Sequence, residues 1–231
     1  AFEPARSSFA PSKVRLTGNP LRRAILSARG TRAERVREPE ARTLAVLGGS
    51  QGARGLNDAA LATAGDFVAA GIRILHQTGA DDHARVAAAY KAGLGSEAVG
   101  EDIAEWMGNG RNATVVPFVN EMEAVYSGAD LVLCRAGAMT VSELTYCGTP
   151  SVLIPLPHAR TDEQRLNARA IADAGAAVVI EQVDLTEKAV RDTVIPLLLD
   201  GQRLAAMERA CATVATPNAT EDLVAAILAL L

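Results

Sequence analysis

Two glycine-rich segments of this 231-residue chain contain the residue types that bind phosphate groups. The first, residues 47–57, reads LGGSQGARGLN; it follows an apolar, strand-like stretch and leads into a helical pattern. Glycine lets backbone N–H groups approach an anion closely, and the start of the next helix adds a partial positive charge. Ser50 adds a hydroxyl group at the same turn. The spacing fits neither the Walker A nor the GxGxxG motif, so this segment alone predicts either a phosphate site or a plain tight turn.

The second segment, residues 130–144, reads DLVLCRAGAMTVSEL and again joins a short apolar strand to a helix. We expect Thr140 or Ser142 to cap that helix and the amides of its first turn to face a diphosphate. Glu143 falls one turn into the helix, where its carboxylate could accept hydrogen bonds from two sugar hydroxyls. The alternative is an acid favoured only by the helix dipole. Two such turns favour a ligand site, because open α/β sheets bind ligands at the carboxyl ends of their strands.

A third polar segment, residues 155–167, reads PLPHARTDEQRLN. Its two prolines end an apolar strand, and Glu163 begins a helix. Gln164 falls in the first turn of that helix, where its amide could donate to and accept from sugar hydroxyls. His158 lies in the preceding loop and could approach a diphosphate.

The other histidines do not predict a metal centre. His83 follows Asp81 and Asp82, but three adjacent residues at a helix start cannot all face one ion, so we expect a role in helix capping. His76 ends a strand, where we expect it to pack or to hydrogen-bond locally. No Asp-x-Asp motif lies near the predicted crevice, so we expect neither an obligatory metal ion nor a cofactor.

Strand-like and helical patterns alternate along the chain. We predict strands at residues 43–47, 72–76, 113–116, 130–134, 151–154 and 177–180, and helices at 53–70, 81–92, 120–127, 140–147, 163–174, 186–199, 201–213 and 219–230. This alternation predicts an α/β fold, a Rossmann-like parallel sheet with helices on both faces. We expect residues 93–112 to form a surface excursion that Trp106 and Met107 hold against the body.

Composition agrees with one compact unit. The hydrophobic fraction of 49% suffices for a core in a chain of this length. Aromatic residues make up only 3%, so we expect Ala, Val, Leu and Ile to fill that core. The sequence shows neither an apolar run long enough to span a bilayer nor a signal peptide. Cys134, Cys147 and Cys211 have no metal-binding spacing, which predicts buried, reduced thiols in the cytosol.

Positive charge is concentrated near the start of the chain. The first 37 residues contain nine Lys or Arg: Arg6, Lys13, Arg15, Arg22, Arg23, Arg29, Arg32, Arg35 and Arg37. The whole chain has a formal charge of −4, so the remainder is acidic. We expect most of these side chains to lie on a solvated helix over residues 20–37. Contact with phospholipid head groups or a pyrophosphate is the alternative.

Four runs resemble the C-terminal domain of the MurG family of glycosyltransferases. They are LGGSQGARGLN at 47–57, HQTGADD at 76–82, CRAGAMTVSELTYCGTPSVLIPLP at 134–157 and DEQRLNARAIADAGAAVVIEQ at 162–182. Residues 17–22, TGNPLR, resemble the interdomain segment of that family, so the resemblance runs from about residue 14 to the C-terminus. It implies the second Rossmann-like domain of a GT-B glycosyltransferase at residues 21–231. Residues 1–20 would then be a remnant of the first domain with its linker.

The resemblance also implies a donor site for UDP-N-acetylglucosamine (UDP-GlcNAc). Arg22 would reach the donor from the linker, and the backbone at Val119 would bind uracil. Glu143 would hold the ribose hydroxyls and Gln164 the GlcNAc. The diphosphate would lie, without a metal ion, against Ser50 and the turn formed by Ala138, Met139, Thr140, Val141, Ser142 and Glu143.

For function, the resemblance implies transfer of GlcNAc, with inversion, from UDP-GlcNAc to lipid I, which gives lipid II for peptidoglycan synthesis. Such an enzyme works in the cytoplasm, peripherally on the inner face of the plasma membrane, and has no nucleic-acid partner. The acceptor-side loop and the catalytic base of the family belong to the other domain. We therefore expect no catalytic base in these residues and no transfer by this chain alone.

Two other functions remain open. The chain could be the donor-binding subunit of a two-chain N-acetylglucosaminyltransferase, like the eukaryotic pair whose motifs it also resembles. It could instead be a nucleotide-sugar-binding module without catalytic activity.

Overall fold

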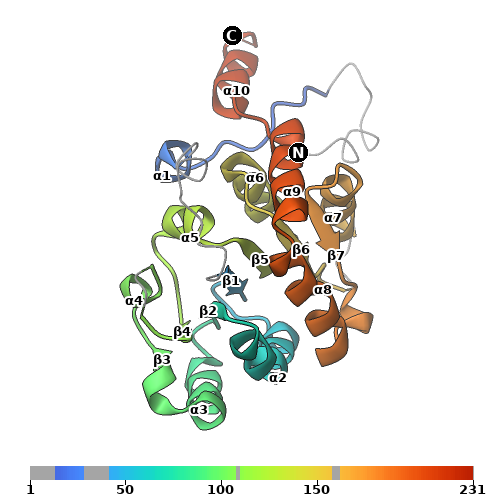
Figure 1. Ribbon diagram of the computed structural model, residues 1–231. Coiled ribbons are helices and arrows are strands. Elements are labelled where there is room, and N and C mark those ends of the chain that lie inside the picture. Colours follow the sequence, from blue (N-terminus) through green and yellow to red (C-terminus); the bar gives the residue numbers. More distant parts are fainter. Residues whose placement is uncertain (1–13, 29–41, 108–109, 158–161, 231) are drawn as a thin grey trace.

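A single parallel sheet organises the molecule. The computed structural model describes residues 14–28, 42–107, 110–157 and 162–230. The strands are β1 (Arg42–Leu47), β2 (Ile72–Gln77), β3 (Val99–Gly100), β4 (Ala113–Val116), β5 (Leu131–Cys134), β6 (Ser151–Leu153) and β7 (Ala177–Val179). Their order is β3-β4-β2-β1-β5-β6-β7, and every pair of neighbours is parallel (Figure 1). The predicted α/β fold is confirmed.

The helices lie on both sides of this sheet (Figure 1). They are α1 (Arg23–Ser27), α2 (Arg54–Ala69), α3 (His83–Leu94), α4 (Ile103–Met107), α5 (Met122–Gly128), α6 (Ala138–Cys147), α7 (Glu163–Asp173), α8 (Glu187–Leu199), α9 (Gly201–Val214) and α10 (Ala219–Leu228). Short 3-10 turns occur at Ser96–Ala98 and Gln182–Asp184.

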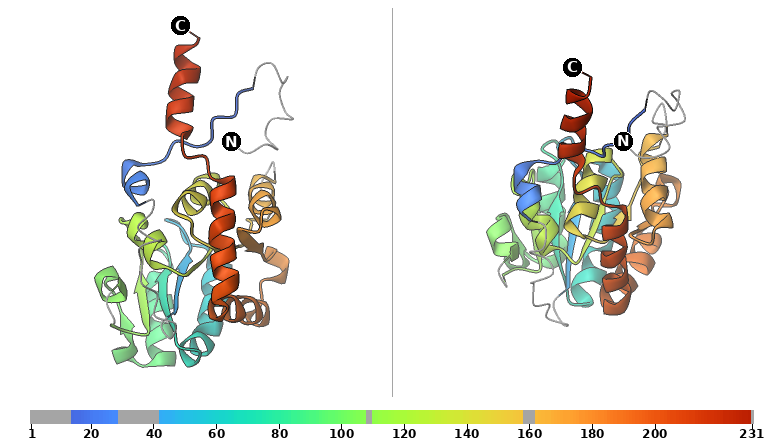
Figure 2. Two further views of the ribbon diagram at one scale, coloured as in Figure 1. Left: turned by 45° about the horizontal axis from the view of Figure 1, so that its top comes forward. Right: turned by 90° about the horizontal axis from the view of Figure 1, so that it is seen from above.

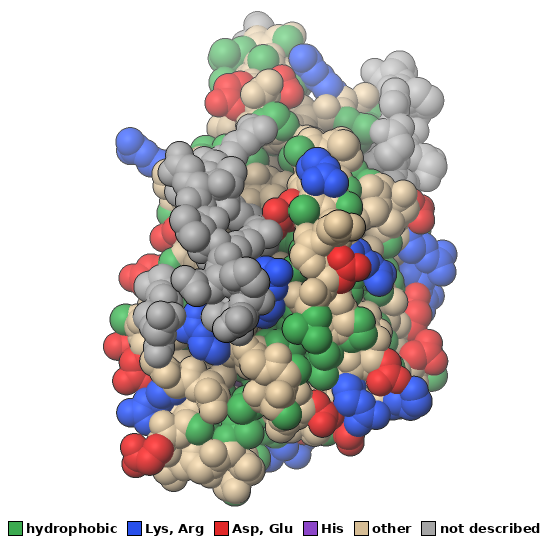
Figure 3. All heavy atoms as spheres, in the orientation of Figure 1, with side chains coloured by type: hydrophobic (Ala, Val, Ile, Leu, Met, Phe, Trp, Pro, Cys, Tyr) green, Lys and Arg blue, Asp and Glu red, His purple; other side chains and the backbone are tan. Residues whose placement is uncertain are grey.

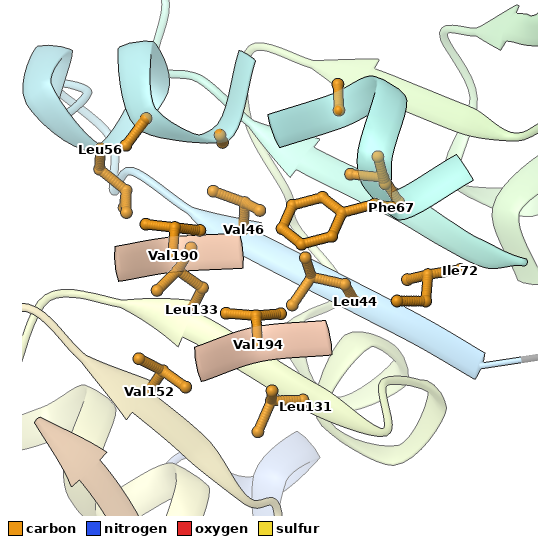
Figure 4. Close-up of a cluster of buried hydrophobic side chains, with 14 of the residues drawn as sticks. Leu44, Val46, Leu56, Phe67, Ile72, Leu131, Leu133, Val152, Val190 and Val194 are labelled. Atoms are coloured by element: carbon orange, nitrogen blue, oxygen red, sulfur yellow. The ribbon is translucent and has the colours of Figure 1, made fainter. Parts of the chain in front are cut away.

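Alternation along the central strand divides the core into two layers. Leu44 and Val46 of β1 join a cluster with α2, α3 and α8, and Figure 4 shows them beside Phe67 of α2 and Val194 of α8. Ala45 and Leu47 point to the opposite face, where the cluster includes residues of α5, α6 and α7. A strand with apolar residues toward both faces is typical of a buried parallel sheet, which explains why β1 reads as a continuous apolar run.

The expected surface excursion is more ordered than its composition indicates. Residues 93–112 contain the edge strand β3 and the short helix α4, neither of which the sequence pattern predicted, because elements of two and five residues are too short to show a period. Trp106 is 1% exposed, so its expected packing is confirmed. The side chain of Met107 lies outside the described part of the chain.

The ends of the described chain meet at one side of the sheet. Gly18 packs against Thr216 and Ala219, and α10 stands away from the sheet and its covering helices (Figure 2). Of the helix expected over residues 20–37, the described residues contain α1, which spans Arg23–Ser27; residues 29–37 lie outside the described part. Arg29, Arg32, Arg35 and Arg37, with Arg6 and Lys13, lie outside the described residues, and the proposed division at residue 20 remains a prediction.

Several surface and thiol predictions can be compared with the described residues. On the face shown in Figure 3, basic and acidic side chains are interspersed. Cys134, Cys147 and Cys211 are buried thiols, as predicted. Within the described residues, no helix is both long and apolar enough to cross a bilayer.

Candidate functional site

A cavity of about 370 Å³ opens where the direction of strand succession reverses, between β1 and β5. Such a switch point is where open α/β sheets bind ligands, because the loops after the two strands diverge there. We call it the switch-point cavity. It is lined by Arg22, Leu47, Gly48, Gly49, Ser50, Gln77, Phe118, Val119, Met122, Tyr126, Cys134, Arg135, Thr140 and Glu143.

The first glycine-rich loop forms one wall of this cavity. It packs so closely against the loop after β2 that a Cβ on Gly52 would lie 2.5 Å from the Thr78 carbonyl oxygen, and a Cβ on Gly79 would clash with the Gly52 backbone. Both glycines also have positive φ angles, of 76° and 81°, which side-chain-bearing residues rarely adopt. Glycine at positions 52 and 79 therefore allows the loop after β1 to pack against the loop after β2, and this packing holds the cavity wall in place.

A buried polar network fixes the same two loops. Asn57, near the start of α2, donates from Nδ2 to the Thr78 carbonyl at 3.0 Å and to Asp82 Oδ2 at 2.8 Å. Its Oδ1 is therefore left to accept from His76 Nε2 at 3.0 Å. With Nε2 protonated, His76 Nδ1 accepts from the Tyr90 hydroxyl at 3.2 Å. The local bonding expected for His76 is confirmed.

Asp82 occupies the N-cap position of α3 without a capping bond from its side chain. Its carboxylate accepts instead from Asn57 and from Arg85, and these hydrogen bonds hold its pKa below the usual range, with Arg85 the larger cause. The expected side-chain cap is thus absent, because a buried amide and a guanidinium compete for the same oxygens. The described residues contain no group of His, Cys, Asp and Glu that could hold a metal ion.

Burial gives His76 a strong effect on stability as the pH changes. It lowers the pKa of His76 to about 3, with Asp82 opposing and Arg85 adding to the shift. Below about pH 6.5 His76 therefore becomes protonated in the unfolded chain, whereas in the folded chain it stays neutral down to about pH 3. The free energy of unfolding should fall by about 2 kcal/mol between pH 7 and pH 5 through this group alone.

Chemical denaturation of the unaltered chain and of His76→Gln at both pH values measures this contribution. The variant should be less stable at pH 7 but should lose much less stability on acidification. His83→Gln keeps the buried imidazole and should retain the full pH dependence. An equal loss of stability in His76→Gln and in the unaltered chain would contradict the assignment.

The start of α6 forms the opposite wall. Gly137 is the N-cap residue, and the Val141 amide already donates to the Gly137 carbonyl at 3.0 Å. The amides of Ala138, Met139 and Thr140 therefore precede the first intrahelical bond and are the ones available to an anion. The expectation that Thr140 or Ser142 caps the helix is wrong, since the helix begins before both of them.

Other residues of the predicted turn have different surroundings. The side chain of Thr140 lines the cavity, whereas Ala138 and Met139 are exposed beside it. Val141 is fully buried in the core. Ser142 accepts from Asn19 Nδ2 at 2.9 Å and donates to the Ala138 carbonyl, so it joins the segment before α1 to α6.

Glu143 is the buried acid of the cavity, with 7% exposure. Its Oε2 accepts from the Tyr126 hydroxyl at 3.0 Å, and its Oε1 accepts from Arg22 Nη2 at 3.3 Å. The structure thus brings together Arg22, Ser50, Val119, Thr140 and Glu143 around one cavity, although these predicted residues come from separate parts of the chain.

Gln164 lies outside the lining of the switch-point cavity. It is the second residue of α7, and its Oε1 accepts from the Leu156 amide at 3.0 Å. Its Nε2 group is therefore the part of the amide that can donate to a ligand. His158 lies outside the described residues.

The sequence interpretation missed Arg135, Tyr126, Gln77, Phe118 and Met122, all of which line the cavity. Arg135 is half-buried and donates to the Ile154 carbonyl at 3.2 Å, and burial lowers its pKa. A guanidinium directly after the carboxyl end of β5 adds positive charge to a cavity that the start of α6 also lines. Its position directly after the strand was a signal that could have identified it.

Comparisons with known proteins agree with this architecture. Residues 43–223 match the glycosyltransferase family 28 C-terminal domain. The UDP-N-acetylglucosamine--N-acetylmuramyl-(pentapeptide) pyrophosphoryl-undecaprenol N-acetylglucosamine transferase of Myxococcus xanthus is 39% identical over 228 residues, which cover 96% of this chain and 54% of that protein. The chain spans about half the length of the curated relatives that it matches.

Solved structures extend the likeness to the fold. MurG of Acinetobacter baumannii superposes with a TM-score of 0.72 at 32% identity, covering 88% of this chain and 54% of that chain. The glycosyltransferase of kitacinnamycin superposes at 0.57 with 18% identity, covering 96% of this chain and 51% of that one. The sheet and its helices therefore have the fold of one half of a GT-B glycosyltransferase.

Proposed function

Because the chain belongs to glycosyltransferase family 28 and is a MurG-like C-terminal domain, we propose that it binds UDP-GlcNAc as the donor for transfer to lipid I. The observation that carries this proposal is the buried Glu143 in a cavity that also holds a glycine-rich loop and the start of α6. The loop and the helix start suit a diphosphate. A buried carboxylate suits neighbouring hydroxyl groups, because it can only accept hydrogen bonds.

The UDP part of the donor then fits within the cavity. The diphosphate lies between Ser50 and the α6 amides, within reach of Arg22 and Arg135. The ribose hydroxyls bind Glu143, and the backbone near Val119 binds uracil. Two guanidinium groups and a helix start give this position the positive charge that a diphosphate requires.

The sugar extends from the diphosphate toward the start of α7, where Gln164 reads its hydroxyls. In the reaction, a hydroxyl of lipid I attacks the anomeric carbon of GlcNAc and UDP departs, with inversion. The share of this chain is to stabilise the negative charge that grows on the departing UDP, which preorganised donors and cations do effectively in a site screened from water. The acceptor and the base belong to the other half of such an enzyme.

Calorimetric titration of Gln164→Ala with UDP and with UDP-GlcNAc tests the donor and its orientation together. The unaltered chain should bind both ligands. The variant should lose about 1–3 kcal/mol of binding free energy for UDP-GlcNAc, and it should bind UDP as before, because UDP lacks the sugar.

Gln202→Ala is a matched control, since Gln202 is the second residue of α9 as Gln164 is of α7. It should bind both ligands normally. Equal losses for UDP and UDP-GlcNAc in Gln164→Ala would point to a disturbed loop at Leu156 instead of a sugar contact. No binding of either ligand by the unaltered chain would refute the proposed function.

A further inference from the structure

The carboxylate of Glu143 is held by two partners of different character. Tyr126 is 1% exposed, whereas the Arg22 side chain is 56% exposed. Burial, together with the charge of Glu143, raises the pKa of the Tyr126 phenol well above its usual value. The phenol therefore stays protonated, and it donates to Glu143 Oε2 at 3.0 Å.

Tyr126 and Glu143 also belong to one firmly connected unit. The Tyr126 carbonyl accepts from Thr149 Oγ1 at 2.9 Å, and the Thr149 amide donates to the Leu144 carbonyl at 2.9 Å. Thr149 follows Gly148, the C-cap residue of α6, so α5 is tied to the helix that carries Glu143. The hydroxyl of Tyr126 therefore reaches Glu143 from a helix that is hydrogen-bonded to the turn after α6.

Arg22, by contrast, can leave Glu143 for another anionic partner. Its guanidinium is more than half exposed and contacts Glu143 Oε1 at 3.3 Å, so water reaches the Arg22 end of this ion pair although Glu143 is buried. A diphosphate entering the switch-point cavity offers Arg22 a more highly charged partner. Oε1 would then become available to a hydroxyl of the ligand.

We propose that Tyr126 is a positioning residue that fixes the rotamer of Glu143 for ribose recognition, while Arg22 holds the place of the ribose until the nucleotide enters. This proposal rests on the proposed function, in which Glu143 binds the ribose. Tyr126 occupies one lone pair of Oε2, so Oε1 and the remaining lone pair of Oε2 face the ribose hydroxyls. Tyr126 itself need not touch the nucleotide.

The test compares UDP with 2′,3′-dideoxy-UDP, which lacks both ribose hydroxyls, in calorimetric titrations of the unaltered chain and of Tyr126→Phe. Phenylalanine keeps the buried ring and removes only the hydrogen bond. The affinity for UDP should fall roughly three- to tenfold, and the affinity for the dideoxy nucleotide should stay nearly constant. In a Glu143→Ala background, Tyr126→Phe should change neither affinity.

Tyr90→Phe is a matched control, because it removes another buried phenol hydroxyl, the one that bonds His76. It should leave the preference for UDP over dideoxy-UDP unchanged. A preference that persists in full in Tyr126→Phe would overturn the positioning role alone. Equal affinities of the unaltered chain for the two nucleotides would remove the ribose contact and overturn both proposals.

A measurement without substitution keeps the test independent of how well the variant folds. The Tyr126 hydroxyl proton, bonded to a buried carboxylate, should give a slowly exchanging proton resonance far downfield. That resonance should persist in chain saturated with UDP. Its loss on saturation would show that the nucleotide displaces Tyr126 from Glu143, which contradicts the proposal.

Discussion

Replacement of Glu143 by alanine should weaken the binding of UDP and of UDP-GlcNAc by the same amount, about 1–3 kcal/mol. Both ligands contain the ribose, so the loss should not depend on the sugar. The carboxylate is 7% exposed and accepts from Tyr126 and Arg22, which means that its removal takes away a buried, oriented acceptor and not a solvated charge. Calorimetric titration with both ligands measures the effect.

The substitution also leaves a small void and removes the acceptor of two hydrogen bonds, so the thermal stability of the variant should fall as well. Titrations should therefore be made well below its unfolding temperature. Glu97→Ala, at an exposed position near the far edge of the sheet, should change neither affinity. A loss confined to UDP-GlcNAc in Glu143→Ala would contradict ribose recognition and would indicate that Glu143 contacts the sugar instead.

The predicted effects of Gln164→Ala and Glu143→Ala differ because the two residues are proposed to bind different parts of the donor, the sugar and the ribose. Gln164 lies on α7, outside the lining of the switch-point cavity, and it already bonds the loop at Leu156. Glu143 lies inside the cavity. If both predictions hold, the donor lies with its nucleoside inside the cavity and its sugar directed toward α7.

Much of this architecture could be predicted from local sequence signals. The buried strand β1 and the glycine loop after it have a hydrophobic run and glycines that mark a strand followed by a tight turn. Ends of elements were harder to predict. The start of α6 was misplaced because Gly137 caps it without a side-chain bond, so Thr140 and Ser142 were the more obvious capping residues.

The missed site residues share a different cause. Tyr126 lies 17 positions before Glu143 in the sequence, and only the packing of α5 beside α6 brings the phenol to the carboxylate. Arg22 contacts Glu143 across 121 positions, whereas the resemblance implied only that Arg22 reaches the donor. Ser142 was expected to face the ligand, but Asn19 occupies its hydroxyl. A hydrogen bond between distant segments leaves no periodic trace in a sequence.

These 231 residues by themselves should bind UDP-GlcNAc and transfer no measurable sugar to a lipid I analogue. Relatives that carry the full name of the transferase are about twice as long, and we place the acceptor and the base in their other half. Holding two reactants in one cleft is worth effective concentrations of about 10⁵–10⁸ M in favourable cases. A half that binds only the donor cannot provide this gain in effective concentration.

Addition of the separately produced N-terminal half of a MurG relative should restore some transfer, provided that the two halves dock. The reaction can be followed as radiolabelled GlcNAc incorporated into lipid product. The same mixture with Glu143→Ala should be much less active at low donor concentration, because donor binding limits the rate there. Donor binding without any transfer in the mixture, despite demonstrated docking of the halves, would favour a non-catalytic binding module. Efficient transfer by the 231 residues alone would overturn the placement of the base, because a complete catalytic centre would then have to lie within this single half.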